Sequence, residues 1–146
     1  GVTSRPTVLS EKKFGASWFV PCGDSYMATL YADAGADYMF ADLPGSGSKP
    51  LSFETVLDKA MHADYWLIKF NLSDDMNYQA FQTEYKPYAS FDAFKNKKIY
   101  YTNTGKVPYY EEVPMHPDYL LKDLVWIFHP ELLPGYKPRY FSRMMD

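Results

Sequence analysis

The chain has 146 residues, 47% of them hydrophobic, which is enough for one globular domain with its own core and excludes a disordered segment. Its formal net charge is −3 and it has no basic block, so nucleic acid and anionic membranes are excluded as expected partners. One cysteine excludes an internal disulfide, and no apolar run is long enough for a membrane-spanning helix.

The first part of the chain alternates short apolar runs with amphipathic segments. Residues 6–10, 18–20 and 38–40 are expected to be strands. Asp24 or Ser25 can cap a helix over 26–34, which Gly35 closes. The Gly-, Ser- and Pro-rich residues 43–50 are expected to form a loop, and Ser52 to cap a helix ending at Ala60.

The second part begins with Tyr65–Ile68, a continuous apolar run typical of a strand covered on both faces. The expected elements after it are a weaker helix over 73–85, a turn at 90–94, a strand at 99–102, a long loop at 103–116 and a helix over 117–128. Pro117 suits the first position of that last helix.

Strands and helices therefore alternate four times along the chain. This order favours parallel strands joined by right-handed crossovers. We expect an α/β fold, a three-layer sandwich whose mostly parallel, Rossmann-like central sheet has four or five strands and helices on both faces. The high tyrosine content, 14 residues, suits an aromatic core and a binding surface equally.

The turn Gly23-Asp24-Ser25 spells the start of an esterase signature. Such a hydrolase needs a histidine that activates Ser25, with an aspartate three residues before it. The three histidines, His62, His116 and His129, follow Lys59, Val113 and Trp126 at that spacing. The sequence thus lacks the base, and Ser25 is interpreted as a helix cap, with no catalytic residue expected in the chain.

Three other motifs are weak as chemical sites. Cys22 lies at a helix start, where a thiol can be reactive, but it lacks a neighbouring histidine. Residues 45–50 resemble a phosphate loop without its Gly-Lys-Ser/Thr ending. The histidines are scattered, so no metal site and no cofactor are expected.

The loops at the strand ends point to binding instead. In open α/β sheets, ligands lie beyond the carboxyl ends of the strands, here at residues 11–23, 41–48, 70–75 and 103–116. The candidate ligand-binding residues in and beside these loops are Trp18, Phe19, Phe70, Tyr109, Tyr110 and His116. Glu111 and Glu112 adjoin them, and the face suits a flat, apolar ligand with polar edges.

Several stretches in this order resemble one family. They are Pro21–Ala28 with Asp33–Ala36, Leu51–Leu57, Ala93–Tyr100, and Pro117–Leu124 with Phe128–Leu133. Together they are similar to the C-terminal lobe of a substrate-binding protein for an ABC importer, of the class that handles iron–siderophore, haem and cobalamin. Cys22 and Lys97 stand where members of that family often have glycine.

The resemblance implies a binding protein, not an enzyme, with two α/β lobes that hold a metal chelate between them. Residues 6–146 would be the C-terminal lobe and residues 1–5 a remnant of cloning or of the interlobe segment. The expected partners are the missing N-terminal lobe, the chelate and an ABC permease, to which Glu54 would dock. The expected location is the periplasm, with or without a lipid anchor.

Two alternatives to this function stay open on the sequence alone. The first is a small esterase that uses Ser25, and the second is a stand-alone α/β interaction domain.

Overall fold

A computed structural model describes residues 5–146, so most of the short segment expected to precede the lobe, residues 1–4, lies outside the described residues. The central sheet has five strands in the order β4-β1-β6-β7-β8. The strands are β1 (Thr7–Ser10), β4 (Asp37–Tyr38), β6 (Tyr65–Phe70), β7 (Ile99–Asn103) and β8 (Ser142–Arg143). The first four are parallel and β8 pairs antiparallel with β7, which confirms the mostly parallel sheet.

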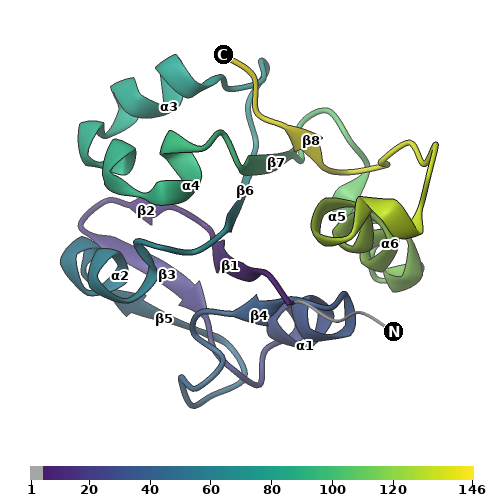
Figure 1. Ribbon diagram of the computed structural model, residues 1–146, viewed down its shortest axis with the longest axis horizontal. Helices are drawn as coiled ribbons and strands as arrows, with labels where there is room; N and C mark the ends of the chain where they lie inside the picture. The colour runs from purple at the N-terminus through teal and green to yellow at the C-terminus, as the bar shows by residue number, and fades with distance from the viewer. Residues whose placement is uncertain (1–4) are drawn as a thin grey trace.

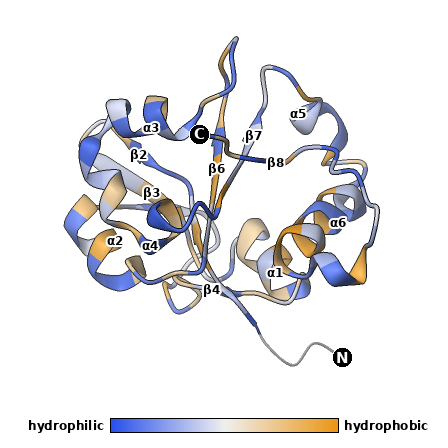
Figure 2. Ribbon diagram, turned by 45° about the horizontal axis from the view of Figure 1, so that its top comes forward, coloured by the Kyte–Doolittle hydropathy of each residue, from blue (hydrophilic) through white to orange (hydrophobic). Residues whose placement is uncertain are grey.

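Helices cover both faces of this sheet, so the expected three-layer α/β architecture is confirmed (Figure 1). One layer holds α1 (Tyr26–Asp33), α5 (Tyr109–Glu112) and α6 (Pro117–Phe128). The other holds α2 (Phe53–Ala60), α3 (Tyr78–Glu84) and α4 (Asp92–Lys95), with a 3-10 turn at Lys86–Ser90. Figure 2 shows β6 between the two layers. Within residues 5–146, no helix has the length and apolar character to cross a membrane.

A second, antiparallel sheet lies in the α2 layer and differs from the expectation. It consists of β2 (Lys13–Phe14), β3 (Ser17–Pro21) and β5 (Ser48–Leu51). The expected loop at 43–50 therefore ends in a strand, and 18–20 lies outside the central sheet. Packing decides this, because Trp18 stacks on Trp66 of the central sheet at 5.6 Å between ring centroids.

The third expected helix begins later than the sequence indicated. Asn77, not the Ser73 region, is its cap, since the Asn77 side chain accepts a hydrogen bond from the Ala80 amide at 2.8 Å. The loop expected at 103–116 contains the single-turn helix α5. The final strand β8 was missed because two residues carry no periodic pattern of their own.

Local turn chemistry supports the other boundaries. The Ser25 and Ser52 hydroxyls accept hydrogen bonds from the Ala28 and Thr55 amides, each at 3.2 Å, and so cap α1 and α2 as expected. Lys97 has a φ of 59°, in the left-handed region that favours glycine. This conformation explains why glycine suits the turn at that position.

The core is built on β6. Trp66, Leu67 and Ile68 are buried against both helical layers, as the apolar run predicted, while Tyr65 is only half-buried. Aromatic side chains fill the α2 side of β6, where Trp18, Trp66 and Phe91 pack with ring centroids 4.8–5.7 Å apart. Much of the aromatic content therefore belongs to the core.

Candidate functional site

The order of the strands determines where a ligand can lie. The chain that leaves β1 reaches β4 through β2, β3 and α1, while the chain that leaves β6 reaches β7 through α3 and α4 on the opposite face. Adjacent strands β1 and β6 thus send their connections in opposite directions. In open α/β sheets, the ligand crevice lies at the carboxyl ends of such a strand pair.

Glu11 stands at the carboxyl end of β1 in a restrained conformation. Its amide donates to the Leu67 carbonyl at 2.8 Å, and its carbonyl accepts from Trp66 Nε1 at 2.7 Å. Its φ of 71° is unusual for a residue other than glycine. Strained backbone of this kind gathers at functional sites and needs surrounding structure to hold it, which β6 provides here.

Lys69 stands near the carboxyl end of β6 and faces the same crevice as Glu11. A groove of about 370 Å³ opens there. It is lined by Glu11, Phe19, Pro21, Ser25, Tyr26, Met27, Ser46, Gly47, Ser48 and Lys69. A small cavity of about 10 Å³ adjoins it and shares Glu11, Met27 and Lys69 with it.

The charges of this groove are only partly compensated. The Lys69 ammonium lies 5.3 Å from the Tyr109 ring centroid and 5.5 Å from that of Tyr110. Burial raises the pKa of the Glu11 carboxyl, and the charges of Lys69 and Lys12 oppose that rise. Burial also raises the pKa of the Tyr109 hydroxyl, so that ring stays neutral.

The structure brings some of the sequence-predicted residues to this groove. Phe19 is 45% exposed and lines it, and Tyr110 is exposed beside Lys69. Tyr109 is nearly buried and lines the small cavity below. Phe19 and Lys69 line the same groove, and the rings of Tyr109 and Tyr110 flank the Lys69 ammonium.

The other predicted ligand-binding residues lie elsewhere. Trp18 is fully buried in the core, so its expected contact with a ligand is wrong. Successive side chains of a strand point to opposite faces, and Phe19 takes the outer one. Phe70 is buried against Tyr101, with ring centroids 5.4 Å apart, and His116 is exposed but stacks on Tyr119 at 4.4 Å.

Sequence reasoning missed Glu11 and Lys69. Glu11 is the first residue of a loop expected at the ligand edge, and that position was the available signal. Lys69 is the one charged residue in an otherwise apolar strand and lies one residue before its end. A cation inside a buried apolar run indicates a specific partner or role. Of the two acids beside Tyr110, Glu112 is structural, because it accepts from the Tyr140 hydroxyl at 2.9 Å.

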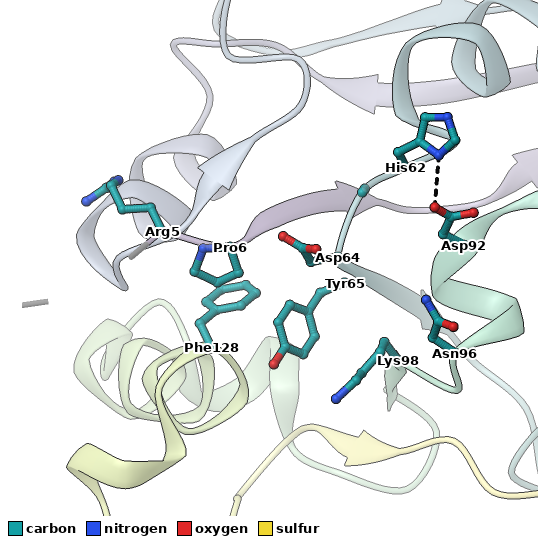
Figure 3. A pocket seen from close by; sticks show the side chains of 10 residues that line it. Arg5, Pro6, His62, Asp64, Tyr65, Asp92, Asn96, Lys98 and Phe128 are labelled. Carbon is teal, nitrogen blue, oxygen red and sulfur yellow. Dashed lines mark hydrogen bonds and ion pairs between the residues drawn. The ribbon is translucent and has the colours of Figure 1, made fainter. Parts of the chain in front are cut away.

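A larger depression, of about 520 Å³, lies at the opposite, amino ends of the strands (Figure 3). Several of its polar groups already have partners in the protein, and open α/β sheets hold their ligands at the other ends of the strands. Asp64 accepts from the Thr7 amide at 3.0 Å, and His62 lies 2.9 Å from Asp92. Arg5 pairs with Asp37. We therefore place the candidate site at the carboxyl edge.

The Gly23-Asp24-Ser25 turn is a structural element. A side chain at Gly23 would meet the Ala41 carbonyl oxygen at 2.0 Å, so only glycine fits. The Ser25 hydroxyl is occupied in capping α1, and Cys22 beside it is buried. Residues 5–146 hold no cluster of His, Cys, Asp and Glu that could bind a metal ion.

Comparison with known proteins matches this architecture to a family. The family described as periplasmic binding protein matches residues 1–104. The chain is a periplasmic binding protein of this family. Its members are substrate-binding proteins of transporters rather than enzymes, so the esterase alternative is wrong and the periplasmic location expected from the sequence is confirmed.

The relatives of this periplasmic binding protein chain are longer than the chain itself. It is 29% identical over 141 residues to an uncharacterized lipoprotein of Methanocaldococcus jannaschii and covers 33% of that protein. The TroA-like periplasmic binding protein FepB of Veillonella parvula superimposes with a TM-score of 0.72 at 21% identity, over 97% of this chain and 49% of FepB.

The haem complex of Staphylococcus aureus IsdE gives a TM-score of 0.59 at 22% identity, over 88% of this chain and 49% of IsdE. The chain thus spans about half, or less, of the proteins it matches. In these longer proteins, the matched segment is one part of the whole.

Proposed function

We propose that this chain is the C-terminal lobe of a substrate-binding protein that captures a metal chelate and delivers it to an ABC permease. The candidates are an iron–siderophore complex, haem and cobalamin. The observation that carries the proposal is the open groove at the β1–β6 crevice, which is lined by the charged Glu11 and Lys69 and by the aromatic Phe19 and Tyr26. A second lobe, present in proteins twice as long, would supply the opposite wall.

Similar proteins support a chelate as the ligand. The periplasmic heme-binding protein RhuT of Roseiflexus and the haem complex of IsdE share this fold. Helicobacter pylori CeuE with nickel and histidine shares it too. Flat, partly apolar chelates match the exposed aromatic rings of Phe19 and Tyr110, and His116, which is exposed outside the groove, stays a proposed contact. The M. jannaschii lipoprotein supports a lipid anchor on the full-length protein.

Glu54 is the proposed docking residue for the permease. It is exposed at the second position of α2, where the helix dipole favours a carboxylate by roughly 0.3–1 kcal/mol. Among residues 5–146, its carboxylate makes no ion pair, so the charge is available to a partner. Exposed charges of this kind act on the docking of two proteins more than on folding.

Uptake of a labelled chelate by cells tests both parts of the proposal. A strain that lacks the gene is expected to lose uptake of its chelate, and the wild-type gene to restore it. Glu54→Arg is expected to restore roughly a tenth or less of that uptake, because it places a cation against basic residues of the permease. Ligand binding by the purified full-length variant is expected to remain within about twofold of wild type.

The matched control is Asp33→Arg, which reverses an exposed carboxylate on α1, across the sheet from α2. It is expected to restore uptake fully. Full uptake with Glu54→Arg at normal protein levels would exclude Glu54 as the docking residue. Uptake unaffected by loss of the gene, for every chelate supplied, would contradict the proposed function itself.

A further inference from the structure

The groove at the β1–β6 crevice has an unbalanced cation. Lys69 is half-buried, and among residues 5–146 its ammonium makes no ion pair and no side-chain hydrogen bond, while two tyrosine rings flank it. A half-buried ammonium loses part of its hydration, and it normally has an anionic partner. Glu11 lines the same groove and its carboxyl interacts with Lys69, but the two groups form no ion pair among the described residues, which leaves the ammonium open to an anion of the ligand.

The wall beside Lys69 also favours an anion. Ser25, Tyr26 and Met27, at the N-terminus of α1, line the groove, and the first turn of that helix holds no acidic residue. The positive end of the helix dipole therefore faces the same space as the Lys69 ammonium. Ser46 and Ser48 add hydroxyl groups from the opposite side.

Glu11 is the one acidic residue in the lining of the groove. Its backbone is held at the crevice by two hydrogen bonds to β6. No hydrogen bond to its carboxyl group is found among the described residues, and the neighbouring Thr102 hydroxyl, buried in the adjoining cavity, is also without a partner. The crevice thus contains polar groups whose hydrogen-bonding capacity is not used inside this lobe.

We propose that Lys69 and Glu11 together form the recognition subsite for an anionic oxygen group of the ligand, which pairs with the Lys69 ammonium and accepts a hydrogen bond from the protonated Glu11 carboxyl. This inference rests on the proposed function and specifies its ligand as an anionic chelate, one that carries carboxylate, phenolate or similar oxygens. A cationic ligand would pair with Glu11 but would meet the Lys69 ammonium and the positive end of α1.

The proposal places a proton on Glu11 in the ligand-bound state, where the anionic group of the ligand lies beside the carboxyl group. Burial already raises the pKa of its carboxyl, and a ligand that covers the groove removes more water. The groups that face it are Lys69 on β6, Lys12 beside it, Tyr31 on α1, Tyr38 on β4 and Tyr109 on α5. Burial raises the pKa of the three tyrosine hydroxyls, which therefore stay neutral, so Glu11 is the acid that couples binding to pH.

The proposal determines whether ligand affinity rises or falls with pH. Because the bound state holds the proton on Glu11, binding takes up a proton, and the affinity is highest at low pH and falls as the pH rises. The substitution Glu11→Gln mimics the protonated acid, since the amide group of a glutamine donates hydrogen bonds and carries no charge. This substitution is therefore expected to preserve binding and to remove its pH dependence.

The test titrates the full-length protein, by tryptophan fluorescence and calorimetry, with three anionic probes and one cationic probe. The anionic probes are haemin, ferric citrate and a ferric tris-catecholate, and the cationic probe is ferrioxamine B. For the anionic probe that binds best, Lys69→Met is expected to weaken binding about tenfold or more. The affinity of wild type is expected to fall as the pH rises, whereas Glu11→Gln is expected to lose this pH dependence and to bind more tightly than wild type at pH 8.

The control is Lys59→Met, which removes an exposed cation of α2 that pairs with Asp42 at 2.8 Å and does not line the groove. It is expected to change affinity by no more than about twofold. Far-ultraviolet circular dichroism verifies that each variant is folded. Calorimetry in buffers of different ionisation enthalpy is expected to show proton uptake by wild type and none by Glu11→Gln.

Three outcomes would overturn the inference. Tightest binding of ferrioxamine B, with a loss of affinity on Glu11→Gln, would assign the opposite charge to the ligand. Unchanged affinity of the best anionic probe in Lys69→Met would remove Lys69 from the site. Binding of none of the four probes to the wild-type protein would contradict the proposed function, and the inference would fall with it.

Discussion

Replacement of Trp18 with alanine is expected to lower the free energy of unfolding of the chain by about 3–5 kcal/mol. Trp18 is fully buried and packs on Trp66, Phe53, Tyr88 and Phe91. Its indole Nε1 also donates to the Ser10 carbonyl at 3.1 Å. The substitution thus leaves a cavity between the two sheets and an unpaired acceptor next to the ligand crevice. Urea denaturation followed by circular dichroism measures the loss.

The matched control is Phe19→Ala, one residue along the same strand. Phe19 is largely exposed on the outer face, so this substitution is expected to cost less than about 1 kcal/mol. Equal losses of stability for the two variants would show that β3 does not present Trp18 to the core as described. The pair of variants therefore separates the structural role of Trp18 from the surface role of Phe19.

Asp123→Ala is expected to cost about 3–5 kcal/mol, although the residue does not line the groove. Asp123 is fully buried on α6, and its carboxylate accepts four hydrogen bonds. The donors are the Tyr136 hydroxyl at 2.6 Å and the backbone amides of Arg139, Tyr140 and Phe141 at 2.7–2.9 Å. Without the Asp123 carboxylate, three backbone amides and one tyrosine hydroxyl lose their acceptor.

This carboxylate holds the C-terminal segment that leads into β8. We therefore expect Asp123→Ala to accelerate hydrogen exchange at the amides of Arg139, Tyr140 and Phe141 before it affects β6. The control is Asp118→Ala, which removes an exposed carboxylate from the first turn of the same helix and is expected to cost less than about 1 kcal/mol. Slow exchange at the three amides in Asp123→Ala would contradict the anchoring role.

The parts of the fold that were predictable share one property, which is a strong local signal. Ser25 and Ser52 cap helices as the sequence indicated, and the apolar run at β6 lies at the centre of the sheet. Asn77 and β8 were missed because long-range contacts determine them. The Asn77 cap begins a helix whose first amide, that of Tyr78, donates to the Met145 carbonyl at the other end of the chain.

The candidate site shows the same division. Its location at the carboxyl edge was predictable from the alternation of strands and helices, but its residues were only partly so. Trp18 and Phe19 are adjacent and equally aromatic, and only the strand alternation in β3 separates a core residue from a surface residue. Glu11 and Lys69 are far apart in the sequence, and the parallel pairing of β1 with β6 brings them together.

The measurement that tests the central claim most directly is a comparison of ligand binding by the full-length protein and by this 146-residue chain. In calorimetric titrations with haemin, cyanocobalamin and ferric siderophores, we expect the full-length protein to bind one chelate with 1:1 stoichiometry. The chain alone is expected to bind the same chelate ~100-fold more weakly or not at all, because half a cleft leaves one side of the ligand in water while the entropic cost of association is unchanged. Equally tight binding by the chain alone, or no chelate bound by the full-length protein, would contradict the account.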